Sequence, residues 1–205
     1  MRSLFPVLIH DFQAFDFENV RDEIIRYAHS ERINSPRGEI NSNEGGWQSR
    51  KNLNEEDSIL RKVLNKSLES YLNSGIFYPG VSFHLNSLWI NINKKDHYNI
   101  LHTHPCSELS GVIYIKNLNK GGKIVFRSPH EFTCFAETHS YTEEINKKYD
   151  NYGAYWMDPL EGTILMFPSM LQHSVTPNKS DEERITASFN ISVANWREGE
   201  EKHIK

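Results

Sequence analysis

Two segments in the first third of the chain show the hydrophobic spacing of amphipathic helices. After Asp16, a suitable N-cap, apolar residues recur at helical intervals from Phe17 onward. A second such segment follows Asn54, carries acidic residues in its expected first turn, and reaches a stop signal at Gly75. The stretch 35–54 between them is rich in Gly, Asn and Ser, and we expect a long loop there, of a kind that is often functional.

From residue 81 onward the pattern changes to short runs of β-branched and aromatic residues separated by turn residues. The runs expected to form strands lie at 81–93, 109–116, 123–127, 162–168, 172–176 and 184–194. No helical pattern separates them, which favours an antiparallel sandwich or jelly roll over a parallel sheet. The predicted fold class is therefore α+β, mainly β, with N-terminal helices that buttress one sheet.

Composition and charge narrow the class of protein. The 205 residues fit a single domain, 1–205, with a helical N-terminal elaboration over 1–80 and a β core over 81–195. A net charge of −4 and a pI near 6.2 argue against a nucleic-acid groove that relies on bulk charge. No apolar run reaches the roughly 20 residues that a membrane span needs, and we find no signal peptide. With only two cysteines, a disulfide framework and a cysteine-based zinc site are disfavoured, so we expect a soluble cytoplasmic protein.

The segment His102-Thr103-His104-Pro105 contains the first candidate chemistry. Side chains alternate along an extended chain, so histidines two residues apart point the same way and can reach a common metal ion. Pro105 then ends the strand. Such pairs also arise by chance, so this segment alone is weak evidence for a metal site.

A later histidine and an arginine add to this segment. His173 follows His102 by 71 residues, at the return of the predicted strands, where a jelly roll can bring both together. Arg184 leads a buried strand and has Thr186 on the same face. Such an arginine is either a rim residue in salt contact with a neighbouring acid, or a guanidinium that grips a carboxylate bidentately.

Taken together, these motifs resemble those of the iron(II)- and 2-oxoglutarate-dependent oxygenases, which have H-x-D/E, a distal histidine, and then R-x-S/T. The most similar branch has an HxHP…SGVYY signature, which reads here as His102-Thr103-His104-Pro105 and Ser110-Gly111-Val112-Ile113-Tyr114. The segment 167–190 and the upstream Gly46-Trp47-Gln48-Ser49 are similar to the same branch. The resemblance covers roughly residues 45–193 and implies a double-stranded β-helix.

The resemblance implies that His102 and His173 bind iron(II), and that Arg184 binds the distal carboxylate of 2-oxoglutarate. For Tyr114, a core aromatic role is the equal alternative. The residues that would line the co-substrate pocket are Arg184, Thr186, Tyr114 and Asn91. The implied reaction is oxidative decarboxylation of 2-oxoglutarate by dioxygen to succinate and carbon dioxide, coupled to oxidation of a substrate, usually hydroxylation.

The third metal ligand departs from the family pattern, because His104 stands where a carboxylate is usual. In the interpretation that we favour, His104 itself coordinates and gives a three-histidine site, because an imidazole there can reach the metal. Alternatively, Glu108 swings in, or the position is left to water or a halide. A neutral ligand leaves the site one positive charge higher and strengthens its attraction for a dianion. Asp96 and Asp158 are unassigned carboxylates that would compensate from a distance.

Two other functions fit the same motifs: a cupin-like three-histidine iron dioxygenase that does not use 2-oxoglutarate, and a non-catalytic jelly-roll binding module. Candidate lids are the loop around Trp47 and the insertion 132–155, which also fit ordinary surface loops. A wall that excludes water would be made by Trp89, Phe126 and Phe167. The sequence does not identify the substrate, for which small molecules and peptides both remain open, or the oligomeric state.

Overall fold

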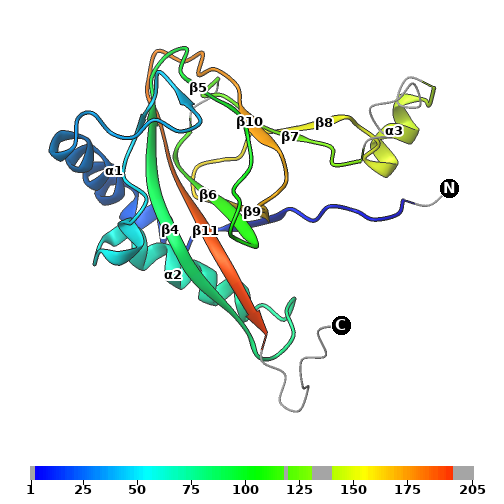
Figure 1. Cartoon of the computed structure of the whole chain (residues 1–205), viewed down its shortest axis with the longest axis horizontal. Coiled ribbons are helices and arrows are strands. Elements are labelled where there is room, and N and C mark those ends of the chain that lie inside the picture. Colours follow the sequence, from blue (N-terminus) through cyan, green and yellow to red (C-terminus); the bar gives the residue numbers. More distant parts are fainter. Residues whose placement is uncertain (1–2, 118–119, 131–139, 196–205) are drawn as a thin grey trace.

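The computed structural model describes residues 3–117, 120–130 and 140–195, which form two antiparallel sheets and three α-helices (Figure 1). The helices are α1 (Phe17–Asn34), α2 (Ile59–Leu72) and α3 (Glu143–Tyr149), with a 3-10 turn at Leu53–Glu55. The six-stranded sheet has the order β1 (His10–Gln13), β9 (Thr163–Pro168), β6 (Leu109–Lys116), β11 (Arg184–Asn195), β4 (Val81–Asn93) and β3 (Trp47–Gln48). The five-stranded sheet has the order β2 (Asn43–Glu44), β5 (Tyr98–His102), β10 (His173–Val175), β7 (Ile124–Arg127) and β8 (Ala154–Met157).

The six-stranded sheet has one apolar and one polar face, as the central strand β11 shows. Side chains alternate between the faces of a strand, so every second residue of β11 belongs to the same face. The residues that share a core with α1 and α2 are Ile185, Ala187, Phe189 and Ile191, all fully buried. The residues of the opposite face are Arg184, Thr186, Ser188 and Asn190, and these line a cavity. The apolar face therefore serves stability, and the polar face is available for chemistry.

A glycine in the centre of this sheet allows the close packing of the core. A Cβ atom at Gly111 would lie 2.2 Å from the ring of Phe189, which is its partner across β6 and β11. It would also lie 2.8 Å from the backbone oxygen of Leu165. Any larger residue would push the ring out of the core, which gives a steric reason for the glycine in the Ser110-Gly111-Val112 motif.

All six predicted strands are found, with each end at most one residue from its predicted position. Strands β4 and β6 have the predicted bounds at both ends. The predicted runs do not include β1, β2, β3, β5, β8 or α3. The extended chain expected around His102 is β5, which ends at His102 and not at Pro105. In Figure 1, β7, β8 and α3 form an arm that projects from the body of the molecule. The helix α3 contradicts the expectation that no helix interrupts the strands.

The start of α2 was predicted too early. The helix begins at Ile59, where the side-chain oxygen of Ser58 accepts a hydrogen bond from the backbone nitrogen of Arg61. The acidic residues after Asn54 therefore precede the helix instead of forming its first turn. Asp16 does precede α1, but it has a left-handed backbone and makes no side-chain capping bond.

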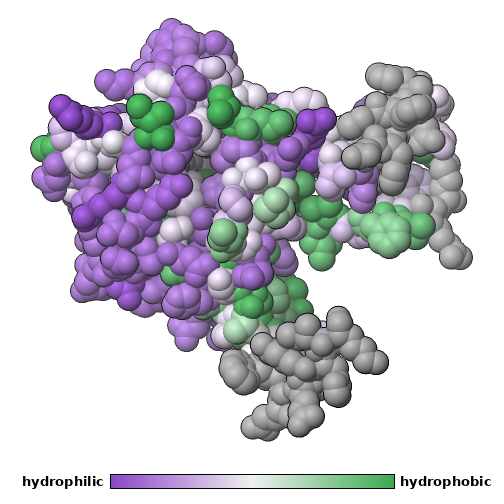
Figure 2. All heavy atoms as spheres, in the orientation of Figure 1, coloured by the Kyte–Doolittle hydropathy of each residue, from purple (hydrophilic) through white to green (hydrophobic). Residues whose placement is uncertain are grey.

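The N-terminal residues 3–9 run beside the projecting arm and, together with it, line a cavity of about 660 Å³. Figure 2 shows apolar atoms gathered along this part of the surface. The predicted lid at 132–155 lies partly outside the described residues. Of the two cysteines, Cys134 lies outside them, and Cys106 is an exposed free thiol. Within the described ranges, no helix has both the length and the apolar character needed to cross a membrane.

Candidate active site

A cavity of about 420 Å³ is lined by residues from both sheets. Strands β4, β6, β9 and β11 of the larger sheet contribute the polar face described above, and strands β5, β7 and β10 of the smaller sheet contribute the other side. The loop and edge strand at 41–51 add further lining residues. All seven residues that the sequence predicts for metal and co-substrate line this cavity: His102, His104, His173, Arg184, Thr186, Tyr114 and Asn91.

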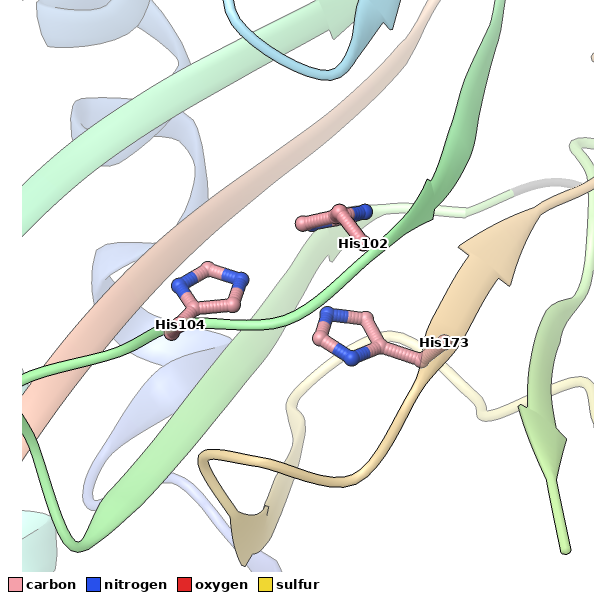
Figure 3. Close-up of side chains that lie close together, drawn as sticks. All are labelled: His102, His104 and His173. Carbon is pink, nitrogen blue, oxygen red and sulfur yellow. The ribbon is translucent and has the colours of Figure 1, made fainter.

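The pairing of β5 with β10 brings together two histidines that lie far apart in the sequence. His173 is the direct partner of His102 across these antiparallel strands. His104 follows two residues later, and its backbone nitrogen donates to the carbonyl of Ser169, 2.8 Å away. One ligand atom from each of the three imidazoles lies within 4.8 Å of those of the other two. Figure 3 shows the three rings grouped around a common space, so they could hold one metal ion.

Two of these histidines are oriented by the backbone. The Nδ1 atom of His102 lies 2.7 Å from the carbonyl of Ile100, and that of His173 lies 2.8 Å from the carbonyl of Leu171. Because a carbonyl only accepts, Nδ1 carries the proton in both rings, and the lone pair is left on Nε2. This is the arrangement that fixes a metal-binding histidine in its coordinating tautomer.

The three imidazoles are uncharged at neutral pH. Burial lowers the pKa of His102 below its usual value. It lowers the pKa of His104 to about 4 and that of His173 to about 3, with the neighbouring histidines adding to both shifts. Because only a neutral imidazole has a lone pair for a metal, these shifts keep the group ready to coordinate.

Aromatic rings hold the histidines in place. The indole of Trp89 stacks on His104, with ring centroids 5.6 Å apart and planes 21° from parallel. Phe167 makes an edge contact with His173 at 4.7 Å, and both of these aromatic residues line the cavity. Phe126, the third residue of the predicted wall, packs behind Phe167 and His173 instead of among the lining residues.

The candidate carboxylates lie apart from the histidines. Among the described residues that line the cavity, none is Asp or Glu. The Glu108 side chain is bonded to the backbone nitrogen of Val193, 3.1 Å away, and is not part of the metal-ligand group. Asp96 forms an exposed ion pair with Lys179. This arrangement gives no support to Glu108 as the third ligand.

The predicted co-substrate residues form a continuous row across the larger sheet. Thr186 on β11 is paired with Tyr114 on β6 and with Asn91 on β4. Arg184 lies two residues before Thr186 and therefore on the same face. The pairing of three neighbouring strands thus places all four residues on one wall of the cavity.

Arg184 is buried without a carboxylate partner. Its exposed fraction is 4%, its Nε atom has no hydrogen-bond partner, and it forms no ion pair with any other described residue. The neighbouring acids are engaged elsewhere, because Asp181 pairs with Lys95 and Glu182 with Lys116. The alternative of a rim arginine in salt contact with a neighbouring acid is therefore wrong.

Further buried polar atoms beside Arg184 have no hydrogen bond of good geometry in the described chain. The Oδ1 atom of Asn91 makes no hydrogen bond. The fully buried hydroxyl of Tyr114 makes none of good geometry, although it lies close enough to the guanidinium of Arg184 to interact with it. Burial raises the pKa of Tyr114 to about 12 and lowers that of Arg184, and the charge of Arg184 opposes the shift of Tyr114. A buried guanidinium without a carboxylate partner is costly, and a bound anion relieves this cost, whereas Oδ1 of Asn91 is an acceptor and would need a donor.

Several cavity residues were not predicted as site residues, and two of them carry polar side chains beside the predicted site. Gln48 on β3 and Lys51 after it both line the cavity. The motif Gly46-Trp47-Gln48-Ser49 was a signal for Gln48, whereas no pattern pointed to Lys51, which lies in an irregular loop.

The comparison with protein families gives a match over residues 87–190 to the family described as "Putative 2OG-Fe(II) oxygenase". The comparison with curated protein sequences gives no match. The matched segment includes the three histidines, Arg184 and the row across the larger sheet. The chain belongs to this family of iron(II)- and 2-oxoglutarate-dependent oxygenases, so it is an enzyme whose cofactor is iron(II) and whose co-substrates are 2-oxoglutarate and dioxygen.

Solved structures share the fold. HygX from Streptomyces hygroscopicus, with nickel, 2-oxoglutarate and hygromycin B bound, has a TM-score of 0.63 at 10% identity, over 91% of this chain and 83% of that one. A prolyl-4-hydroxylase from Pseudomonas putida has a TM-score of 0.57 at 13% identity, over 91% and 92%. The viral collagen prolyl hydroxylase of Paramecium Bursaria Chlorella virus-1 has a TM-score of 0.56 at 16% identity, over 89% and 94%.

Proposed function

We propose that His102, His104 and His173 together bind one iron(II) ion in a three-histidine site. The proposal is supported by the short distances among their ligand atoms and by the backbone carbonyls that direct Nε2 of two rings toward the shared space. It is also supported by the engagement of Glu108 with a backbone nitrogen elsewhere. Imidazole is a suitable ligand for iron.

We further propose that Arg184 binds the distal carboxylate of 2-oxoglutarate, assisted by Thr186, Tyr114 and Asn91. The observation that carries this proposal is the burial of Arg184 without any carboxylate partner among the described residues. A planar guanidinium and a nearby hydroxyl suit a carboxylate, which accepts two parallel hydrogen bonds. The same observation favours this function over a dioxygenase that does not use 2-oxoglutarate, because such an enzyme gives no reason for the buried charge.

The enzyme would then hydroxylate a substrate, with release of succinate and carbon dioxide. When bound, iron(II) supplies the centre at which dioxygen is activated. The protein's own residues hold the co-substrate at one wall and keep the imidazoles neutral and oriented. Trp89 and Phe167 limit the access of water to the histidines.

We extend the proposal to the fold and its organisation. The two facing sheets would form a double-stranded β-helix within a single domain, 1–205, and α1 and α2 would buttress its larger sheet over the shared core. A cytoplasmic location stays a prediction from the sequence.

An anaerobic titration tests the metal and co-substrate assignment. Iron(II) followed by 2-oxoglutarate should give a visible charge-transfer band, and calorimetry should show one metal bound per chain. The variants His104→Ala and Arg184→Met should remove metal binding and co-substrate binding, respectively. Absence of both the band and metal binding in the unmodified protein would disprove the proposed function.

A further inference from the structure

The segment from Gly46 to Lys51 brings into the cavity two polar groups that the proposed iron and 2-oxoglutarate sites do not use. Gln48 is 2% exposed, and its Nε2 atom has no hydrogen-bond partner in the described part of the chain. Lys51 lines the same cavity. A buried amide nitrogen without an acceptor is costly, so its presence in a cavity wall points to a ligand that supplies the acceptor.

The local structure of this segment fixes Gln48 toward the cavity. A Cβ atom at Gly46 would lie 2.6 Å from Oδ1 of Asn93, so glycine lets the edge strand lie close to β4. The indole nitrogen of Trp47 donates to a backbone carbonyl of the preceding loop at 2.8 Å. The hydroxyl of Ser49 accepts from the backbone nitrogen of β4 at 2.9 Å. Every residue of the Gly46–Ser49 motif thus helps to hold this wall or to present Gln48.

Lys51 lies beside the metal-ligand group. Its Nζ atom is 5.5 Å from the ring centroid of Trp89, and the same ring stacks on His104. Lys51 is exposed, so its ammonium group is also in contact with solvent. It forms no ion pair with any described carboxylate within 4.0 Å. The ammonium group is therefore available to a ligand that is bound near the metal.

The described lining of the cavity is positively charged, and the iron(II) of the proposed site would add to this charge. This described lining contains Arg184 and Lys51 as cations and no acidic residue. In the proposed site, 2-oxoglutarate uses one carboxylate at Arg184 and the other end at the metal. These contacts use neither Lys51 nor Gln48, and the substrate that is to be oxidised can supply an anion for both.

We propose that Gln48 and Lys51 form an anion-binding subsite, and that the substrate carries a carboxylate or phosphate group that this subsite holds beside the histidines. Nζ of Lys51 pairs with the anion and Nε2 of Gln48 donates a hydrogen bond to it. The ring of Trp89 supports the adjoining part of the substrate. This inference rests on the proposed function, and its test separates the two.

The test uses the full chain loaded with manganese(II) and saturating 2-oxoglutarate in the absence of dioxygen. Calorimetry first measures the affinities for metal and 2-oxoglutarate, so that a failure at this stage counts against the proposed function. Inorganic phosphate and labelled acetate are then added, and nuclear magnetic resonance measures their relaxation. Manganese shortens the relaxation times of nuclei bound near it, which reports an anion inside the cavity.

We expect saturable relaxation of phosphate, acetate or both, and the anion that responds identifies the class of substrate group. Lys51→Gln should weaken anion affinity by about tenfold, since a charge-assisted hydrogen bond is lost. Lys51→Arg should retain most of the affinity. Lys66→Gln is the matched control, because Nζ of Lys66 also lies over an aromatic ring, that of Phe15 at 5.2 Å, but away from the cavity. Gln48→Leu should weaken anion binding without changing the affinity for 2-oxoglutarate.

Three results would overturn the subsite. The first is the absence of saturable relaxation for both anions in a protein that binds metal and 2-oxoglutarate. The second is equal relaxation in the unmodified protein and in Lys51→Gln. The third is a loss of 2-oxoglutarate affinity in Gln48→Leu, or displacement of 2-oxoglutarate by the added anion, because either result assigns these groups to the co-substrate.

Discussion

Replacing Arg184 with Met should change stability and co-substrate binding in opposite directions. Methionine has a similar length and no charge, so it fills the volume without needing a partner. The guanidinium is 4% exposed and has no carboxylate partner among the described residues. Removing an unpaired buried charge should raise the free energy of unfolding of the metal-free protein by about 1–3 kcal/mol. For a chain of this size, each kcal/mol raises the melting temperature by about 2–4 °C.

The same substitution should remove the binding of 2-oxoglutarate. A bidentate contact with a carboxylate contains two charge-assisted hydrogen bonds, each worth about 1.5–3 kcal/mol. Their loss corresponds to a rise in Kd of about two to four orders of magnitude. Scanning calorimetry of the metal-free protein and anaerobic titration of 2-oxoglutarate into the manganese form measure the two effects separately.

A paired arginine supplies the control. Nε of Arg21 lies 2.7 Å from the carboxylate of Glu161 in a partly exposed ion pair. Arg21→Met should lower stability by at most about 1 kcal/mol and leave 2-oxoglutarate binding unchanged. If Arg184→Met instead destabilised the protein and left the affinity for 2-oxoglutarate intact, Arg184 would be a structural residue and the reasoning from its missing partner would be refuted.

Three further predictions concern the metal and the core. His104→Ala should lower the affinity for iron(II) by more than about tenfold, since the loss of a residue that merely supports a metal ligand already costs that much. Glu108→Gln should leave this affinity unchanged. If calorimetry showed the larger loss in Glu108→Gln, the carboxylate would be the third ligand. Burial lowers the pKa of His104 to about 4 and that of His173 to about 3, so both accept protons more readily in the unfolded chain. The metal-free protein should therefore have its full stability above pH 6.5 and lose stability as the pH falls from there toward about 3. Denaturant titrations over this range should show a smaller loss of stability when both histidines are replaced by Asn. Gly111→Ala should cost about 1–3 kcal/mol through its clash with the core, whereas Gly153→Ala, with nothing within 4 Å of the added Cβ, should be nearly neutral in the same denaturant assay.

The elements that could be predicted from the sequence are those with a periodic pattern. Strands β4 and β6 were predicted with their observed bounds because β-branched, aromatic and other apolar residues recur along both segments and turn residues follow or precede them. The start of α2 was misplaced because several polar residues in succession can cap a helix, and only the fold shows that Ser58 makes the capping bond. The short edge strand β3 has too few residues for any period to appear.

The site was predictable to the extent that strand spacing determines it. The order of the strands suggests that His102 and His173 come together, as the pairing of β5 with β10 shows. Two histidines at one point suggest a metal site. The isolation of Arg184 could not be predicted, because only the fold shows that the three acids before it pair with other residues. Asp181 pairs with Lys95, Glu182 with Lys116, and Glu183 with Arg32 and His29. Lys51 was missed because a residue in an irregular loop has no face that a pattern could assign.

The division of β11 into two faces has a consequence for how this enzyme can change over evolutionary time. Residues that alternate along one strand obey separate constraints, because one set packs with the helices and the other lines the cavity. A substitution at Ser188 or Asn190 alters the shape and hydrogen bonding of the cavity without disturbing the packing around Phe189. New substrate preferences can therefore arise by single substitutions on this strand while the scaffold keeps its stability.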